Sequence, residues 1–274
     1  RDRVRPILIN NWEATYFDFT EEKLLDIALT AKEHGVEMFV LDDGWFGNRC
    51  DDTAGLGDWI ENRKRLPNGI ARLSEKIEQI GLKFGLWFEP EMVNRDSDLF
   101  RAHPEWVIAA PGRHMTHGRN QFVLNFGCKE VVDYIYDSMS KILKNAKISY
   151  IKWDMNRSIT EAFSNVLPSD RQGEVFHRYI LGVYDLYERL NETFPQILFE
   201  SCSSGGGRFD PGLLYYAPQG WASDDSDALE RMKIQYGTSL CYPISSIGAH
   251  VSKCPNEQVY RNTPIETRAN VACF

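Results

Sequence analysis

The chain has 274 residues, of which 26% are charged and 43% are hydrophobic. This length suits one large α/β barrel domain, and the composition excludes an intrinsically disordered chain. The formal net charge of -8 offers no basic surface that could neutralise phosphates, so we expect no nucleic-acid partner.

Short apolar runs alternate with amphipathic segments along the chain, which is typical of βα units around a parallel sheet. The predicted strands occupy residues 6–12, 38–42, 83–89, 150–154, 197–201, 219–224 and 244–248. The predicted helices occupy residues 20–34, 70–80, 129–145, 173–193, 227–239 and 264–273. Thr20 is the expected N-cap of the first helix, and Gly35 is its expected stop.

Seven strands are one fewer than a closed (β/α)8 TIM barrel contains. We therefore expect residues 1–274 to form a catalytic barrel domain that is truncated before its eighth strand, as a fragment of a longer multidomain chain. Two long loops, residues 44–69 and 91–126, are expected to be functional, and the second includes an extended stretch at residues 122–125.

The six cysteines form no C-x-x-C pair, and a chain of this size does not need disulfides to fold. Reduced thiols and a cytoplasmic location are therefore expected. No apolar run approaches the length of about 18 residues that crosses a bilayer, so we expect no membrane partner.

The active site of such a barrel lies at the C-terminal ends of its strands, where this chain is strongly acidic. The residues that close the apolar runs are Trp12, Asp42, Asp43, Trp87, Glu89, Glu91, Asp154, Ser201, Cys202, Asp224, Asp225 and His250. Acids gathered there can bind a divalent metal, hold sugar hydroxyls or act in acid/base catalysis. The sequence lacks H-x-H and H-E-x-x-H motifs, so no metal or other cofactor is expected, although an all-oxygen Mg²⁺ site needs few protein ligands.

Glycoside hydrolysis needs two carboxyl groups across one bond, and Asp154 and Asp224 meet this requirement on the fourth and sixth predicted strands. Both strands face one central mouth. An alternative remains, because an arbitrary aspartate at a strand end more often caps the following helix.

Five motifs carry a resemblance to a known family. Residues 151–157, IKWDMNR, resemble the nucleophile motif of the bacterial α-galactosidases of glycoside hydrolase family 36. Residues 221–228, WASDDSDA, resemble the acid/base motif of the same family. Residues 41–47, 87–91 and 200–208 match further motifs in the family's order, so the likeness covers essentially the whole chain.

This resemblance implies that Asp154 is the nucleophile and that Asp224, rather than Asp225, is the general acid/base. It also implies that Asp42 and Asp43 hold galactose hydroxyls, the axial 4-OH among them. The further substrate-binding residues that it implies are Trp12, Trp87 as an apolar wall, Arg119, Lys152, Asn156, Cys202 and Gly205.

The expected function is that of a retaining, exo-acting α-galactosidase, which releases terminal α-linked galactose from raffinose-type oligosaccharides and related α-galactosides such as melibiose by double displacement. A galactosyl-transferring enzyme similar to raffinose synthases is an alternative. A metal-dependent barrel lyase or isomerase and a non-catalytic sugar-binding barrel are two others. The resemblance also implies a homo-oligomer, often a tetramer.

Overall fold

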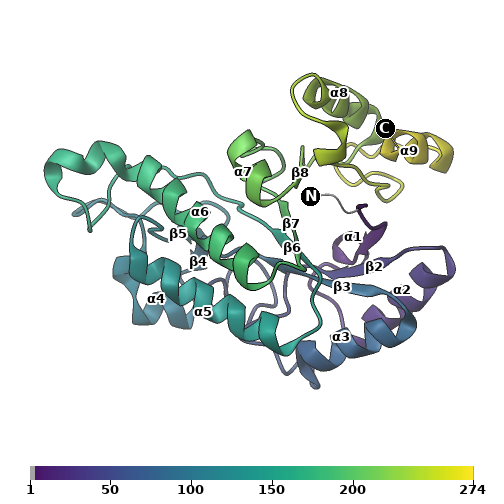
Figure 1. Ribbon diagram of the computed structural model, residues 1–274, viewed down its shortest axis with the longest axis horizontal. Helices are drawn as coiled ribbons and strands as arrows, with labels where there is room; N and C mark the ends of the chain where they lie inside the picture. The colour runs from purple at the N-terminus through teal and green to yellow at the C-terminus, as the bar shows by residue number, and fades with distance from the viewer. Residues whose placement is uncertain (1–3, 274) are drawn as a thin grey trace.

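The computed structural model of the protein describes residues 4–273 (Figure 1). Its main feature is a parallel sheet of seven strands in the order β1-β2-β3-β6-β7-β8-β9. These strands are β1 (Leu8–Asn10), β2 (Met38–Leu41), β3 (Lys83–Phe88), β6 (Tyr150–Trp153), β7 (Leu198–Ser201), β8 (Gln219–Trp221) and β9 (Ile247–Gly248). Each lies within one of the seven predicted strands, so the sequence prediction of seven parallel βα units is confirmed.

The helices are α1 (Trp12–Thr15), α2 (Glu21–Glu33), α3 (Gly69–Ile80), α4 (Asp98–Ala102), α5 (Lys129–Asn145), α6 (Val175–Thr193), α7 (Pro211–Tyr216), α8 (Ala228–Ser239) and α9 (Ile265–Ala272). The side chain of Thr20 accepts a hydrogen bond from the Lys23 amide, which confirms it as the N-cap of α2. Gly35 follows α2 with a φ of 82°, a left-handed conformation that suits glycine, and this confirms the predicted stop.

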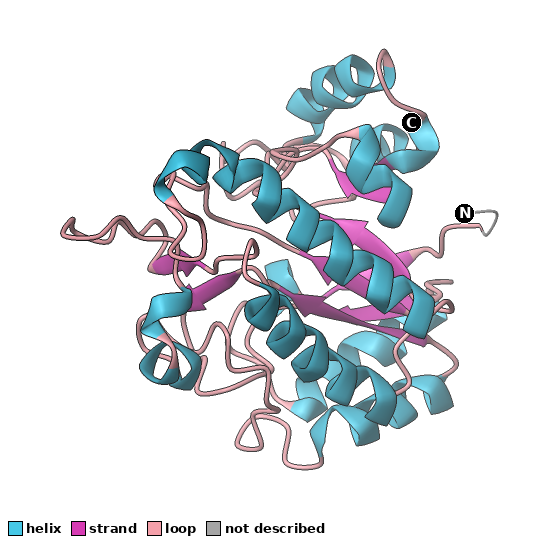
Figure 2. Ribbon diagram, turned by 60° about the vertical axis from the view of Figure 1, so that its left-hand side comes forward, coloured by secondary structure: helices cyan, strands magenta, loops and turns pink. Residues whose placement is uncertain are grey.

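The sheet is apolar along its central strands because helices cover it. Every residue of β2 is buried, as are five of the six residues of β3. The helix pairs α2 with α3 and α5 with α6 pack side by side on the outer face (Figures 1 and 2). In α3 the buried residues Ile70, Leu73 and Ile77 form one stripe, as the periodicity predicts.

The sheet curls so that the two ends of the chain approach each other. The backbone amide of Lys253 donates to the Glu13 carboxylate at 3.0 Å, and the Arg5 guanidinium donates to the Pro218 carbonyl at 3.2 Å. Figure 1 shows α8 and α9 together near the C-terminus, on the opposite side of the molecule from α4. Within residues 4–273, no helix combines the length and apolar character of a membrane span.

The structure corrects several predicted boundaries. The predicted strand 6–12 ends at Asn10, and Trp12 begins helix α1 because the Asn11 carbonyl and amide side chain start a turn toward Thr15. The predicted strand 219–224 ends at Trp221. In the predicted strand 244–248 only the last two residues are extended, because Pro243 leads into a 3-10 turn at Ile244–Ser246.

The predicted loop 91–126 contains an additional pair of short antiparallel strands, β4 (Met92–Asn94) and β5 (Gln121–Val123), and the chain between them includes α4. The extended stretch predicted at residues 122–125 corresponds to β5. The strand β4 was not predicted, since three residues are too few to show a period.

Candidate active site

Asp42 lies at the C-terminal end of β2 and is held by two neighbouring strands. One carboxylate oxygen accepts hydrogen bonds from the Asn10 amide at 2.6 Å and from the Lys152 ammonium at 2.9 Å. The side chain is buried. Because Asn10 ends β1 and Lys152 lies on β6, this carboxylate ties together three strand ends, as the predicted ring of acids requires.

Asp43 is fixed by Arg49, a residue that the sequence analysis did not single out. The guanidinium contacts both oxygens of the carboxylate, at 2.5 and 2.7 Å, and Arg49 is only 2% exposed. Arg49 also donates to the carbonyl of Ala54 and to the side chain of Asn94. Burial raises the pKa of Asp43, and the positive charge of Arg49 opposes that rise.

Replacing Arg49 with Met is therefore expected to leave the Asp43 charge buried without its partner. The expected loss is about 3 kcal/mol of unfolding free energy, because a broken buried ion pair leaves an uncompensated charge. Thermal melting of the full-length protein would show it as a midpoint several degrees lower. The exposed pair Lys129 and Asp133 provides a control, and Lys129→Met should barely change the midpoint. Equal melting of both variants would contradict the structural importance of Arg49.

Asp154 follows β6 and accepts three hydrogen bonds. Trp87 donates through its indole nitrogen at 3.2 Å, Asn156 through its side-chain amide at 2.7 Å, and Met155 through its backbone amide at 2.9 Å. The residue is 7% exposed. These three donors fix the orientation of the carboxylate, as a nucleophile requires.

Lys152 lies two residues before Asp154 on β6 and carries a charge between the acids. Burial alone would lower its pKa, but the negative charges of Asp42 and Asp154 raise the pKa above its ordinary value. The ammonium group therefore stays protonated and offers donors beside two carboxylates.

Asp224 lies after β8, at the open side of the site. Desolvation by the surrounding protein and the charge of Asp154 raise the pKa of Asp224, while Lys152 and Arg119 oppose the rise. The two predicted catalytic carboxyls thus interact electrostatically across the site. A raised pKa favours the protonated form that a general acid needs.

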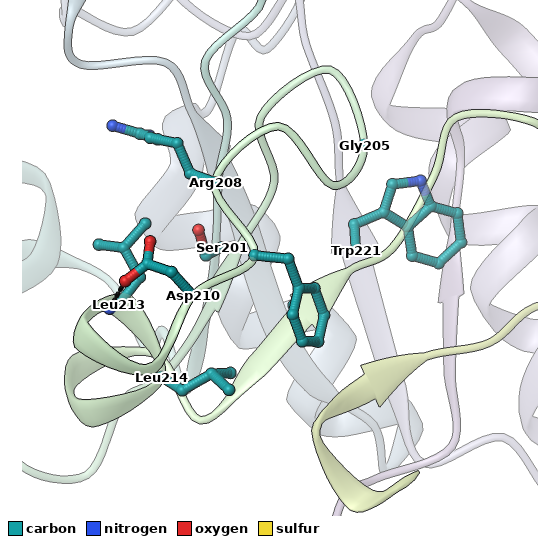
Figure 3. Close-up of a pocket in the computed structure, with 9 residues that line it drawn as sticks. Ser201, Gly205, Arg208, Asp210, Leu213, Leu214 and Trp221 are labelled. Atoms are coloured by element: carbon teal, nitrogen blue, oxygen red, sulfur yellow. Dashed lines mark hydrogen bonds between the residues drawn. The ribbon is translucent and has the colours of Figure 1, made fainter. Parts of the chain in front are cut away.

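The loop after β7 brings Cys202 and Gly205 against Asp224. Gly205 has a φ of 82°, and a Cβ there would lie 2.5 Å from the backbone nitrogen of Asp224, so only glycine allows this approach. Figure 3 shows Gly205 at the turn of this loop, with Arg208 and Trp221 on opposite sides of it. Cys202 is 2% exposed, and burial raises the pKa of its thiol well above the usual range.

A small hollow lies below this loop, between α7 and the strands β7 and β8 (Figure 3). Its lining includes Ser201, Phe209, Leu213 and Trp221. The catalytic carboxyls Asp154 and Asp224 are not part of this lining but Gly205 is, so the hollow adjoins the site along the loop after β7.

Two further glutamates, Glu89 and Glu91, brace the site through hydrogen bonds. Glu91 accepts two hydrogen bonds from Arg208, each at 2.8 Å, and one from the indole of Trp153 at 2.8 Å. Glu89 is fully buried and accepts from the backbone amide of Asn156 and from the Gln121 side chain. Both therefore support the segment that carries Asp154.

Trp12 and Arg119 lie at the edge of this group. The backbone amide of Trp12 donates to the Asn10 side chain, which in turn binds Asp42, and its ring packs edge-on against Tyr16 and Phe17. Arg119 is exposed in the loop before β5, and its charge acts on Asp224. The structure brings the other predicted ligands together through direct contacts, whereas these two reach the acids indirectly.

Helix capping does not explain Asp154 or Asp224. The acids that cap the helices after β7 and β8 are Asp210, whose side chain accepts from Gly212 and Leu213, and Asp227, which accepts from Glu230. Helix α6, which follows β6, has Glu174 at its N-cap position. Neither Asp154 nor Asp224 is the N-cap of a helix, and the Asp154 carboxylate instead accepts from Trp87 and Asn156.

The arrangement combines a carboxylate that has three donors with an acid of raised pKa, and the charge of the Lys152 ammonium, which Asp42 holds, acts on both. Such a pair can attack a carbon and protonate a leaving oxygen. In the part of the chain that the structure describes, no group of three or more His, Cys, Asp or Glu side chains is arranged to hold a metal ion.

Comparison with known proteins bears on the whole chain. A family model described as melibiase matches residues 1–274. The chain is 58% identical over 272 residues to the α-galactosidase AgaA of Geobacillus stearothermophilus, which covers 99% of this chain and 37% of AgaA. It is 57% identical over 274 residues to the α-galactosidase Mel36A of Lactobacillus acidophilus, which covers 100% of this chain and 37% of Mel36A.

A solved structure agrees with these relatives. The crystal structure of a variant of AgaA, a family 36 α-galactosidase of Geobacillus stearothermophilus, in complex with raffinose matches with a TM-score of 0.97 at 57% identity. The match covers 99% of this chain and 38% of that chain. The chain therefore spans a little over a third of the length of the relatives that it matches.

Proposed function

The chain belongs to the melibiase family, together with the α-galactosidases of glycoside hydrolase family 36, and we propose that its full-length protein hydrolyses terminal α-linked galactose with retention of configuration. The observation that carries this proposal is the pair of carboxyls, Asp154 and Asp224, at the ends of β6 and β8. One accepts three hydrogen bonds and the other has a raised pKa.

The proposed reaction has two steps. In the first, the Asp154 carboxylate forms a bond to the anomeric carbon of galactose while Asp224 gives its proton to the leaving glycosidic oxygen. In the second, Asp224 takes a proton from water, the oxygen of that water bonds to the anomeric carbon, and the ester to Asp154 breaks. Two inversions at one carbon leave the configuration unchanged.

The groups around the pair have proposed roles in holding galactose. Asp42, Asp43 and Lys152 offer acceptors and donors to its hydroxyls, and the donors on Asn156 and Trp87 keep Asp154 in place. Trp87 is also proposed as an apolar wall. The remaining proposed sugar ligands are Trp12, Arg119, Cys202 and Gly205.

The proposed substrates are raffinose-type oligosaccharides. Crystal structures of AgaA variants hold raffinose and stachyose. We extend this substrate class to the present chain because of its 58% identity to AgaA.

We also propose that the seven-stranded sheet is the larger part of a (β/α)8 barrel, with residues 1–274 as the catalytic domain of a longer protein. Support comes from the all-parallel strand order, which has β1 and β9 at its edges. An eighth strand between these edges would close the barrel. The cytoplasmic location and the homo-oligomer stay predictions of the sequence.

The test is incubation of the full-length protein with raffinose and quantification of the sugars released. Hydrolysis gives equal amounts of galactose and sucrose, and this is the expected result. Sucrose without matching galactose, together with a larger oligosaccharide, would mean galactosyl transfer instead. Intact raffinose and intact 4-nitrophenyl α-galactoside after incubation with folded protein would overturn the proposal.

A further inference from the structure

Residues 112–120 end the connection from β4 and lead directly into β5, and we call this segment the hairpin tip. It carries Arg119. Arg119 and the following Asn120 have φ values of 50° and 60°, in the left-handed region that residues other than glycine seldom occupy. They are the two central residues of a β-turn that the Gln121 amide closes by donating to the Gly118 carbonyl at 2.9 Å, and positive φ at both central positions is typical of tight hairpin turns. The turn is anchored on one side by Asn94, whose side chain donates to the Asn120 carbonyl at 2.8 Å.

The other anchor is Arg157, which lies three residues after Asp154. Its Nη2 donates to the carbonyl of Thr116 at 2.7 Å, and also contacts the hydroxyls of Thr116 and Thr160, each at 3.1 Å. The side chain is only 5% exposed, and Glu161 pairs with it at 3.6 Å. This arginine is therefore committed to a contact between two loops.

Two further contacts strengthen the same junction. Gly118 lies directly on the arginine, since a Cβ at this position would be 3.4 Å from the Cγ of Arg157. The Thr116 hydroxyl also meets the hydroxyl of Thr160 at 2.8 Å and binds the Glu161 carboxylate. The hairpin tip is thus clamped to the segment that follows β6, and Arg157 is the residue that reaches across.

We propose that Arg157 is a positioning residue, which holds the hairpin tip, and with it Arg119, in place against the segment that follows Asp154. This inference rests on the proposed function and adds to it a link between the Asp154 segment and the Asp224 side. Among the described residues, Arg157 bonds to Thr116 and Thr160 and to neither Asp154 nor Asp224. Its proposed effect on Asp224 therefore passes through Arg119 on the hairpin tip.

The link has an electrostatic consequence. Arg119 opposes the rise in the pKa of Asp224, so a displaced tip leaves Asp224 with a higher pKa. The charged and titratable groups that act on Asp224, or on which it acts, come from the strand ends, the tip and α8: Lys152, Asp154, Cys202, Arg119 and Arg231. Of these groups, only Arg119 is carried by the clamped tip.

The test is a double-mutant cycle in the full-length protein with 4-nitrophenyl α-galactoside as substrate. Arg157→Met should lower kcat/KM by about tenfold, because a shift of about 1 Å in a positioned group has effects of this order or larger. Adding Arg119→Met should bring the activity to that of Arg119→Met alone. In both single variants the basic limb of the pH profile should move to higher pH. Multiplying effects in the double variant, or an unshifted limb, would overturn the inference.

Matched variants separate this role from a general loss of stability. Arg178 forms a more exposed pair with Glu174 at the same i,i+4 spacing, so Arg178→Met should keep the wild-type kcat/KM and pH profile. Thr116→Val removes the exposed hydroxyl of the clamp and leaves the buried Arg157 in place. It should lower kcat/KM and move the basic limb to higher pH, as Arg157→Met does, but by smaller amounts. Arg157→Lys should recover part of the activity, since it keeps one donor.

A readout without catalysis completes the test. Hydrogen exchange of residues 112–120 should accelerate in Arg157→Met while the melting midpoint stays within a few degrees of the wild type. Unchanged exchange in that segment would overturn the inference even if the activity fell. A wild-type protein inactive on every α-galactoside would instead contradict the proposed function, and the exchange result would then still report on the clamp alone.

Discussion

Asp154→Asn is expected to abolish the release of 4-nitrophenol from 4-nitrophenyl α-galactoside by the full-length protein. The amide has no negative charge and cannot form the ester to the anomeric carbon, so a loss of about 10⁴-fold or more is expected. The variant can keep most of the shape of the site, because an amide oxygen in the place of Oδ2 still accepts from Trp87 and Asn156, and only the bond from the Met155 amide to Oδ1 is lost. Initial rates over a range of substrate concentrations measure the loss.

Two controls accompany this variant. Asp210 also lies in the loop after a strand of the sheet but caps α7, so Asp210→Asn should retain activity within about threefold. A chelator added to the wild-type protein should leave the rate unchanged, as carboxylate chemistry without a metal requires. An Asp154→Asn protein that keeps more than about a tenth of the wild-type rate would remove Asp154 from the chemistry.

The second large effect is expected at Asp224, and it should depend on the leaving group. Asp224→Ala removes the proton donor, so raffinose hydrolysis should fall by about 10³-fold or more. Formation of the galactosyl-enzyme from 4-nitrophenyl α-galactoside should fall much less, because nitrophenolate leaves without a proton. Single-turnover and steady-state rates on both substrates separate the two steps.

The pH dependence of kcat/KM gives a second test of Asp224 as the general acid. Asp224 must be protonated to act as an acid, and its pKa is raised by desolvation and by Asp154. Wild-type kcat/KM on raffinose should therefore stay high below that pKa and fall as the pH rises through it. The Asp224→Ala variant should lose this basic limb. A variant that kept both the limb and the rate on raffinose would show that another group donates the proton.

Sodium azide provides a chemical check on the same variant. Azide needs no general base, so it can replace water in the second step: its terminal nitrogen bonds to the anomeric carbon as the ester to Asp154 breaks. The expected product from Asp224→Ala is α-galactosyl azide, with a faster turnover of 4-nitrophenyl α-galactoside. A β-configured azide would mean that no ester to the enzyme had formed.

The helices and strands that the sequence predicts correctly are those with a long, regular pattern of apolar residues. Helix α5 shows one apolar stripe over many turns, and the strands β2 and β3 are apolar runs followed by acids. Helices α1, α4 and α7 have at most six residues and leave no comparable pattern. The turn that Asn11 starts also depends on a bond to a distant residue, since the Asn11 side chain accepts from the backbone amide of Asp42 at 2.8 Å.

The same limit applies within the site. Asp42 and Asp154 follow the ends of β2 and β6, so the parallel order of the strands alone places both at the same edge of the sheet. Arg49 lies in an irregular loop, and no spacing reveals that its guanidinium returns to Asp43. Arg208 is likewise part of a recognised motif, but its pairing with Glu91 depends on where two loops cross. The sugar-binding roles of Trp12, Arg119, Cys202 and Gly205 rest on the family resemblance and stay predictions.

The anomer of galactose that is released first shows whether the reaction at Asp154 and Asp224 retains the configuration. The full-length protein is mixed with 4-nitrophenyl α-galactoside, and proton NMR follows the anomeric signals before mutarotation mixes them. The proposed double displacement predicts α-galactose first, with the β-anomer appearing only as the sugar equilibrates. β-Galactose as the first product would contradict a covalent intermediate on Asp154 and require a single displacement by water.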